Sequence, residues 1–437
     1  MLARICFVIL IFFNFIVQFA YSVQEAIEEE YLKKFDIAWE RFIHSNAFII
    51  TCNSYVSIIN LIYPIGLSDE SSNKVGVRYV FFYLLYSGIK DILETNDLVC
   101  KVNFEVENDY GVISIVIPPQ YSVEKIIGLI RDFATKPSFK PDYQLDYNTL
   151  YVISNDISEY YTNTFNSILL YFRQNIFSAH PYSFLSLGNP SNIKHITIQD
   201  INDLLSRVNL EVIFFIALGF NQNEIALRKI FGYNSHKNFR FNNFRDRYYY
   251  REVEITKNRT FSLPIRSESS YFLYLFTAPE FDRNFEDYLA MLVIDNILTD
   301  TMDGILWREL RENQGMVYSI YSQYPILRYT SYYILFTSCY YKNQTEVRKR
   351  MNKILGSLEL SIDVISYSKQ KLCSRGYLNL ISPKEFADSM VYCLLYRDKR
   401  ISPFYISRYI SLLEPTRIKA VYDKYFSRYY VFIFEGG

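Results

Sequence analysis

Two side chains on one short segment, Arg311 and Tyr318, are the first candidates for chemistry in this chain. An arginine offers a fixed positive charge and a fork of N–H donors, which suit a peptide carbonyl or the oxyanion formed from it. A tyrosine hydroxyl can donate a further hydrogen bond to the same oxygen. The structural alternatives are a solvated cation at a helix end for Arg311 and a packed aromatic ring for Tyr318, in a chain with 41 tyrosines.

Other catalytic constellations are missing from the sequence. The four histidines include no pair at metal-ligand spacing, and we interpret His180 and His195 as polar contacts rather than ligands; the others are His44 and His236. The sequence has no G-x-S-x-G nucleophile motif, no cysteine–histidine signature and no glycine-rich phosphate loop. An independently active enzyme would therefore need a site that these patterns do not describe.

The elements that must position Arg311 and Tyr318 can be predicted from local pattern. Residues 303–311 predict a helix, Gly315 ends it, and a strand begins at Met316. Helices and strands are predicted in a similar order on either side of this segment. In the first half, strands are expected at 47–52, 57–62, 112–117 and 210–218, and helices at 75–92, 122–135 and 196–208. In the second half, strands are expected at 271–276, 332–339 and 430–435, and helices at 285–298, 303–311 and 346–358.

This order predicts an α+β fold with two homologous domains that arose by internal duplication. Each domain should be a mainly antiparallel sheet packed with helices, and the two should face each other as half of a clam-shell chamber. A chain of 437 residues suits two domains of roughly 200 residues each. The predicted boundaries are a signal peptide at 1–22, an N-terminal domain at 30–232, a linker at 233–262 and a C-terminal domain at 263–437.

The N-terminus predicts export. Arg4 precedes an apolar run at 5–19, and Ala20-Tyr21-Ser22 fits a cleavage site before Val23. We expect a periplasmic protein without a membrane span after cleavage; secretion, or anchoring by an uncleaved segment, are the alternatives. Lys+Arg and Asp+Glu balance at 46 each, so the net charge favours neither nucleic acid nor an acidic partner, and we expect no nucleic-acid binding. Five cysteines follow the signal, and a Cys52–Cys100 disulfide is one open possibility among them.

Several segments, in order, resemble the insulinase/pitrilysin-type zinc peptidases, including the mitochondrial processing peptidase. Arg308 to Ser319 resembles the "LREKRGLAYS" segment of that family, whose Arg and Tyr reach the substrate. The other similar segments are Gly66-Leu67-Ser68-Asp69-Glu70 ("GSRDE"), Gly76 to Gly88 ("GLAHFLEHLLFSG"), Val152 to Ile157 ("VILREM"), His180-Pro181-Tyr182 with Leu187-Gly188 ("HPYG…LG"), and Val293 to Leu298. The resemblance implies that Arg311 and Tyr318 bind substrate.

The same resemblance implies that the zinc site is lost. Family members bind zinc through H-x-x-E-H, where two histidines hold the metal, a glutamate activates water, and a distant glutamate completes the site. The matching positions here are Tyr79, Phe82, Tyr83 and Asp156. Neutral phenols with a pKa of about 10 are poor zinc ligands, and Phe82 cannot carry a proton. We therefore expect no metal and no catalysis on this chain alone.

Two functions follow from the resemblance. In the first, this chain is the non-catalytic subunit of a heterodimeric zinc peptidase. A homologous partner then supplies H-x-x-E-H and zinc, and Arg311 and Tyr318 complete the partner's site around a peptide. In the second, it is an inactive peptide-binding or structural homologue with no proteolytic role. The presence of Arg311 and Tyr318 favours the first.

Overall fold

The computed structural model describes residues 29–139, 147–178, 180–208, 210–232, 255–301, 303–378 and 382–437. The predicted signal peptide at 1–22 and residues 233–254 of the predicted linker lie outside the described residues, so those predictions stay untested. The last residues of the predicted linker, 259–262, belong to a strand, β6 (Arg259–Ile265). Of the helices in the described ranges, none combines the length and apolar character that a bilayer-spanning segment requires.

The first half of the chain forms a five-stranded sheet with the order β1-β5-β2-β4-β3. All neighbours are antiparallel except β1 and β5, which are parallel. The central strands β2 and β5 are buried along their whole length because both faces of the sheet are covered. The strands are β1 (Ala47–Thr51), β2 (Ser57–Tyr63), β3 (Lys101–Val106), β4 (Gly111–Ile117) and β5 (Ile213–Leu218).

The second half repeats this topology strand for strand, with the order β6-β10-β7-β9-β8 and β6 parallel to β10. The remaining pairs are antiparallel, as in the first half. This identity of order and direction confirms the predicted α+β fold with two homologous halves. Besides β6, the strands are β7 (Ser269–Thr277), β8 (Val317–Gln323), β9 (Tyr332–Tyr340) and β10 (Tyr430–Gly436).

Helices connect the strands in both halves. In α3, the Ser122 hydroxyl accepts from the Lys125 N–H at the N-cap, and the apolar side chains of one face are buried. The first half has a helix at 29–42, η1 (Leu67–Asp69), α2 (Val77–Thr95), α3 (Val123–Thr135), α4 (Tyr147–Thr162), α5 (Thr164–Ile176), η2 (Pro181–Ser183), α6 (Pro190–Ile193), α7 (Ile198–Arg207) and α8 (Glu224–Phe231). The second half has α9 (Phe285–Thr299), η3 (Trp307–Glu312), η4 (Tyr341–Asn343), α10 (Gln344–Gly356), α11 (Ile362–Leu378), α12 (Pro383–Tyr396), η5 (Lys399–Ile401), α13 (Pro403–Leu412) and α14 (Pro415–Tyr425).

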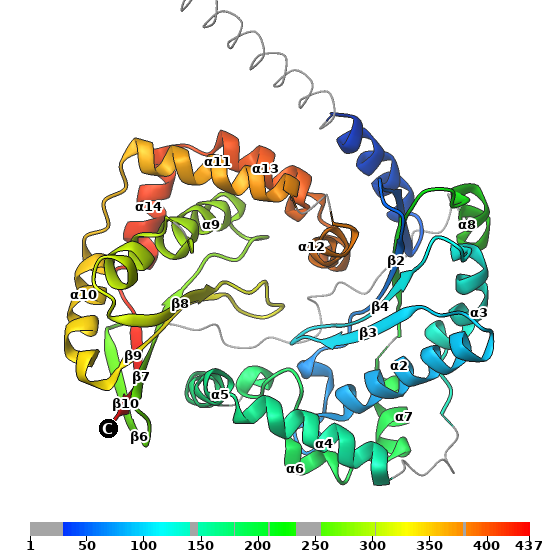
Figure 1. Ribbon diagram of the computed structural model, residues 1–437, viewed down its shortest axis with the longest axis horizontal. Helices are drawn as coiled ribbons and strands as arrows, with labels where there is room; N and C mark the ends of the chain where they lie inside the picture. Colours follow the sequence, from blue (N-terminus) through cyan, green and yellow to red (C-terminus); the bar gives the residue numbers. More distant parts are fainter. Residues whose placement is uncertain are drawn as a thin grey trace, which may run out of the picture.

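The two halves cover each other's sheets. Helix α12 of the second half lies against β2 and β5 of the first (Figure 1), where Phe386 packs 5.6 Å from Phe215 between ring centroids. Helix α5 of the first half packs in return on the sheet of the second. There Phe172 lies 5.9 Å from Tyr332 and 5.5 Å from Phe432. Each half thus buries apolar side chains of the other, and these contacts hold the two halves together.

A buried polar junction also joins the halves. The loop between β8 and β9 brings Arg328 to the first half, where its N–H donates to Asp109 at 2.9 Å. The hydroxyl of Tyr182 donates to the other oxygen of Asp109 at 2.6 Å. The Arg328 guanidinium lies 3.9 Å from Asp69, and both side chains are 3% exposed. The loop after β8 is therefore held by the other half of the molecule.

Candidate functional site

The segment that carries Arg311 and Tyr318 is a short π-helix, a glycine turn and a strand. The π-helix is η3, and this rare geometry is frequent at functional sites. Gly315 adopts φ +59°, and its N–H donates to the carbonyl of Arg311 at 2.8 Å. A left-handed glycine here lets the chain reverse without steric cost and enter β8. The predicted order of helix, glycine stop and strand is confirmed, and the helix is of the wider π type.

The structure brings Arg311 and Tyr318 together. Nη1 of Arg311 donates to the backbone carbonyl of Tyr318 at 3.0 Å. The guanidinium carbon also lies 4.3 Å from the ring centroid of Trp307, which is within the range of a cation–π contact. The side chain of Arg311 is exposed, so its remaining N–H groups can reach a ligand outside the chain.

Tyr318 occupies a β-bulge. Val317 pairs with Cys339 and Ser319 with Ser338, so Tyr318 has no partner on β9. A bulge redirects the side chain of the extra residue. The Tyr318 side chain is 58% exposed, although β8 packs on the core through its neighbours. The ring therefore extends from an edge strand into solvent.

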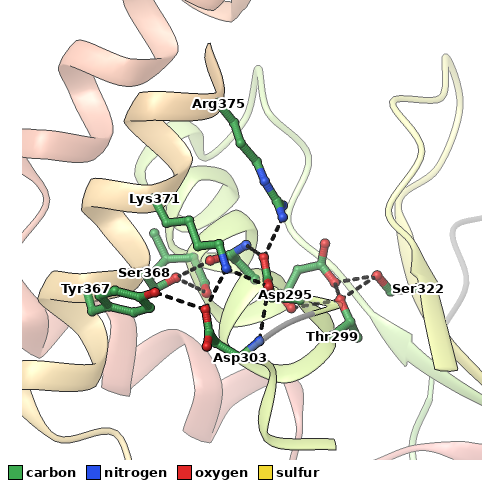
Figure 2. Close-up of polar contacts among 11 residues, drawn as sticks. Asp295, Thr299, Asp303, Ser322, Tyr367, Ser368, Lys371 and Arg375 are labelled. Atoms are coloured by element: carbon green, nitrogen blue, oxygen red, sulfur yellow. Dashed lines mark hydrogen bonds and ion pairs between the residues drawn. The ribbon is translucent and has the colours of Figure 1, made fainter. Parts of the chain in front are cut away.

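A buried carboxylate behind β8 fixes the strand to helix α9. Asp295 accepts hydrogen bonds from the hydroxyls of Thr299, Ser322 and Tyr333, which belong to α9, β8 and β9 (Figure 2). Burial raises the pKa of Asp295, and these hydroxyl donors oppose the shift. This cluster carries no signal in the sequence, because its members lie on three elements and share no motif.

A second set of contacts joins α9 to α11. The Asp300 carboxylate forms ion pairs with Lys371 at 2.7 Å and with Arg375 at 2.5 Å, and its side chain is 2% exposed. Lys371 also contacts Asp303 at 2.7 Å (Figure 2). The two clusters together hold the elements next to the Arg311–Tyr318 segment in one arrangement.

At the degenerate metal position, Phe82 is part of the hydrophobic core. Its ring is fully buried and lies 5.5 Å from the ring of Tyr63. It also fills the space above Gly111 of β4, where an added Cβ would lie 2.2 Å from the Phe82 ring. The position that corresponds to a water-activating glutamate thus holds an apolar group with no room for water beside Gly111.

The tyrosines that match the histidine positions form an aromatic cluster with β3. Tyr79 and Tyr83 lie 5.4 and 6.2 Å from the ring of Phe104. Burial, with the charge of Asp156, raises the pKa of Tyr79 to about 12, and the same two causes raise the pKa of Tyr83. The charge of Asp156 on α4 therefore acts on both phenols.

These residues do not fit zinc. Phe82 offers no donor atom, and the raised pKa of both phenols keeps them protonated, whereas zinc prefers thiolate, imidazole and carboxylate ligands. Within the described ranges, no group of three or more His, Cys, Asp and Glu side chains is arranged to hold a metal ion.

The histidines His180 and His195, which were weighed as metal ligands, differ in burial and in the contacts they make. His180 is buried, its Nδ1 accepts from the N–H of Tyr182 at 3.0 Å, and burial lowers its pKa to about 4. His195 is exposed, and its backbone carbonyl accepts from Lys74. His236 lies outside the described residues. The cysteines Cys52, Cys100, Cys339, Cys373 and Cys393 are all free thiols, so the open possibility of a Cys52–Cys100 disulfide is not realised.

Part of the chain matches the model of a known protein family. Residues 221–363 match the family model described as Peptidase M16 inactive domain. The matched range contains η3, Gly315 and β8, and so both Arg311 and Tyr318. None of the curated protein sequences is significantly similar to this one.

Solved structures share the fold over nearly the whole chain. A protease from Helicobacter pylori superposes with a TM-score of 0.71 at 14% identity, covering 89% of this chain and 96% of that one. A peptidase M16 inactive domain from Pseudomonas fluorescens gives 0.69 at 14% identity, with 89% and 95% covered. A chain of complex III2 from Candida albicans gives 0.66 at 12% identity, with 90% and 94% covered. At these identities the likeness concerns the fold alone.

Proposed function

We propose that this chain is a non-catalytic homologue in the insulinase/pitrilysin-type M16 peptidase family and that it completes the active site of a zinc-bearing partner subunit. One observation carries the proposal. Arg311 and Tyr318 are both exposed on one segment and joined through the backbone carbonyl of Tyr318, whereas the residues that match the zinc motif are buried aromatic rings such as Phe82. Such a chain can contact a substrate but cannot activate water.

The role proposed for the two side chains follows from their chemistry. Arg311 keeps several N–H groups beyond the one given to the carbonyl of Tyr318, and these can bind a peptide carbonyl or its oxyanion. The hydroxyl of Tyr318 can donate to the same oxygen. The partner's zinc would supply the activated water when bound.

We propose a homologous partner with an intact H-x-x-E-H motif. The two chains would enclose a chamber, with this chain as one half. Because the halves of this chain are joined by reciprocal packing and by the Arg328–Asp109 junction, it can present Arg311 and Tyr318 without a large rearrangement.

The test is co-purification from the cells that produce the protein, followed by peptide cleavage with and without a zinc chelator. The proposal predicts a homologous chain with H-x-x-E-H in the eluate and chelator-sensitive cleavage. Arg311→Ala should lower kcat by about 100-fold, as for loss of one oxyanion donor, and Tyr318→Phe by about tenfold.

Arg308→Ala is the matched control, because Arg308 lies exposed on the same π-helix and makes no contact with Tyr318 among those resolved. Its activity should equal that of the wild type. Equal losses for Arg308→Ala and Arg311→Ala would point to a general charge effect and contradict the proposed role. A protein that purifies alone and is inert with zinc would favour the inactive peptide-binding or structural homologue.

Export is proposed separately. Residues 1–22 would direct the chain out of the cytoplasm, to the periplasm if the source is a bacterium with two membranes. N-terminal sequencing of the mature protein should start at Val23. A mature chain that still begins at Met1 and fractionates with membranes would support the uncleaved anchor instead.

A further inference from the structure

Strand β6 forms a solvent-exposed edge of the second sheet. It pairs with β10 on one side, at the opposite edge of the sheet from β8 and Tyr318 (Figure 1). Within the described ranges, no strand pairs with its other side. Thr260, Ser262 and Pro264 of this strand are exposed. The edge therefore has room for a further strand, and the proposed function does not use it.

The register of β6 against β10 shows which backbone groups face outward. The N–H of Arg259 donates to the carbonyl of Tyr429 at 3.3 Å, so the odd-numbered residues of β6 direct their N–H and C=O groups towards β10. The residues between them direct these groups to the other side. The N–H and C=O of Thr260 and Ser262, and the C=O of Pro264, therefore face away from the sheet. Such a row of donors and acceptors can bind an extended chain as an added strand.

The two faces of β6 differ in character. Phe261, Leu263 and Ile265 are half-buried and pack against the core that lies between the halves. The alternate side chains, Thr260 and Ser262, are polar or small and exposed. Because side chains alternate along a strand, an added strand would continue both faces of β6. It should therefore carry apolar side chains on one face and polar side chains on the other.

The start of β6 is surrounded by exposed cations. They are Lys257, Arg259, Arg348 and Arg428. Nη2 of Arg348, on α10, donates to Oγ1 of Thr260 at 3.1 Å, which places this cation beside the strand. The carboxylate of Glu346 on the same helix pairs instead with Arg350 at 2.7 Å. At the other end of the strand Arg266 and Glu268 carry opposite charges, so the basic character belongs to the start of β6.

Charge and Pro264 decide which occupant suits this edge. Antiparallel pairing of β6 with a second copy, centred on Ser262, would bring Arg266 of one copy next to Arg259 of the other. Pro264 also has no N–H to give to such a ladder. Acidic side chains, in contrast, complement the cations at the start of the strand. The edge thus disfavours self-pairing and favours an acidic partner.

We propose that β6 binds an extended acidic segment of another protein as an additional strand. The backbone of this segment forms hydrogen bonds with the outward groups of Thr260 and Ser262. Its carboxylates contact Arg259 and Arg348, and its apolar side chains extend the row that Phe261 begins. This docking strand lies at the opposite edge of the sheet from Tyr318, so it binds independently of the substrate contact proposed above.

The test measures binding of a fluorescein-labelled peptide to the full chain by fluorescence anisotropy. The probe alternates valine and glutamate over the 7-residue length of β6. Two control peptides replace the glutamates with lysine or the central valine with proline, which cannot complete a ladder. The proposal predicts saturable binding of the acidic peptide and about tenfold or weaker binding of both controls.

Variants of the chain separate the ladder from the charge. Ser262→Pro removes an outward N–H and no N–H that bonds to β10, and should weaken binding about tenfold, whereas Ser262→Ala should not. Reversal of two charges, Arg259→Glu with Arg348→Glu, should weaken binding by a similar factor, and Arg408→Glu, at an exposed residue of α13, should not.

Circular dichroism checks the fold of each variant, and the charge reversal keeps the test decisive if Ser262→Pro does not fold. Arg311→Ala should bind the acidic peptide as the wild type does, which separates this surface from the proposed active-site role. Equal binding of the lysine peptide, unaltered binding in a folded Ser262→Pro, unaltered binding after charge reversal, or no binding of the acidic peptide would each overturn the proposal.

Discussion

Replacing Tyr182 by phenylalanine should weaken the junction between the halves, and the loss should depend on pH. The Tyr182 hydroxyl donates to the buried carboxylate of Asp109 at 2.6 Å. A hydrogen bond to a charged group contributes roughly 1.5–3 kcal/mol, so Tyr182→Phe should lower the free energy of unfolding by about 2 kcal/mol near neutral pH.

The pH dependence follows from the pKa of Asp109. Burial raises this pKa above its usual value, while the hydrogen bond from Tyr182 and the N–H of Arg328 oppose the shift. A carboxyl whose pKa is raised on folding destabilises the folded protein when it is ionised, and this penalty disappears as the pH falls below the folded-state pKa. Tyr182→Phe removes an opposing donor and raises the pKa further. The difference in stability between variant and wild type should therefore shrink on acidification, as Asp109 takes up a proton.

Urea unfolding at neutral and mildly acidic pH measures this difference. Trp39 in the first half and Trp307 in the second provide one fluorescent probe in each half, isolated by replacing the other tryptophan with phenylalanine. Tyr63→Phe is the matched control, since the fully buried Tyr63 hydroxyl donates to the backbone carbonyl of Ala134, which does not titrate. A Tyr182→Phe effect that is constant with pH, or that grows on acidification, would refute the assigned role of Asp109.

Three further predictions concern the site and its support. Gly315→Ala forces a side chain into φ +59° and should cost about 1 kcal/mol of stability, measured by urea unfolding, together with a loss of peptide cleavage in the reconstituted complex. Phe82→Ala leaves a cavity in the core and should cost about 3–5 kcal/mol, seen as a large fall in Tm; a near-neutral effect would contradict its placement. Lys371→Met removes one cation from the buried Asp300 and should cost about 3 kcal/mol at neutral pH; the measurement is urea unfolding of the variant beside the wild type.

The strands and helices predicted correctly were those with a strong local pattern. The β-branched runs of β1, β2 and β4, the capped helix α3 and the apolar helix α9 lie close to their predicted places. The edge strand β3 was missed although Lys101–Val106 alternates polar and apolar residues, which is the pattern of a half-buried strand, because the run has only 6 residues. Helices α4 and α5 were missed because their segments are rich in Tyr, Asn and Ser, which have weak helix propensity.

The candidate site also has features that the sequence predicts and features that it does not. Its glycine turn was visible in the sequence because only local backbone geometry was needed. The bulge at Tyr318 depends on the register of β8 against β9, and the Asp295 cluster depends on side chains brought together from α9, β8 and β9. Those features are tertiary, and a single sequence holds no periodic pattern for them.

The residues that match the zinc motif and the Arg311–Tyr318 segment differ in what folding demands of them. Phe82, Tyr79 and their neighbours now form core packing, so restoring histidine or glutamate there would bury polar groups without partners and destabilise the chain. Arg311 and Tyr318 are exposed, and an exposed cation–π contact contributes about 0.5–1 kcal/mol. Stability alone therefore accounts for the aromatic residues at the metal position. It does not account for an exposed arginine and an exposed, bulged tyrosine on one segment. The proposed contact with a peptide in a partner's site would account for both.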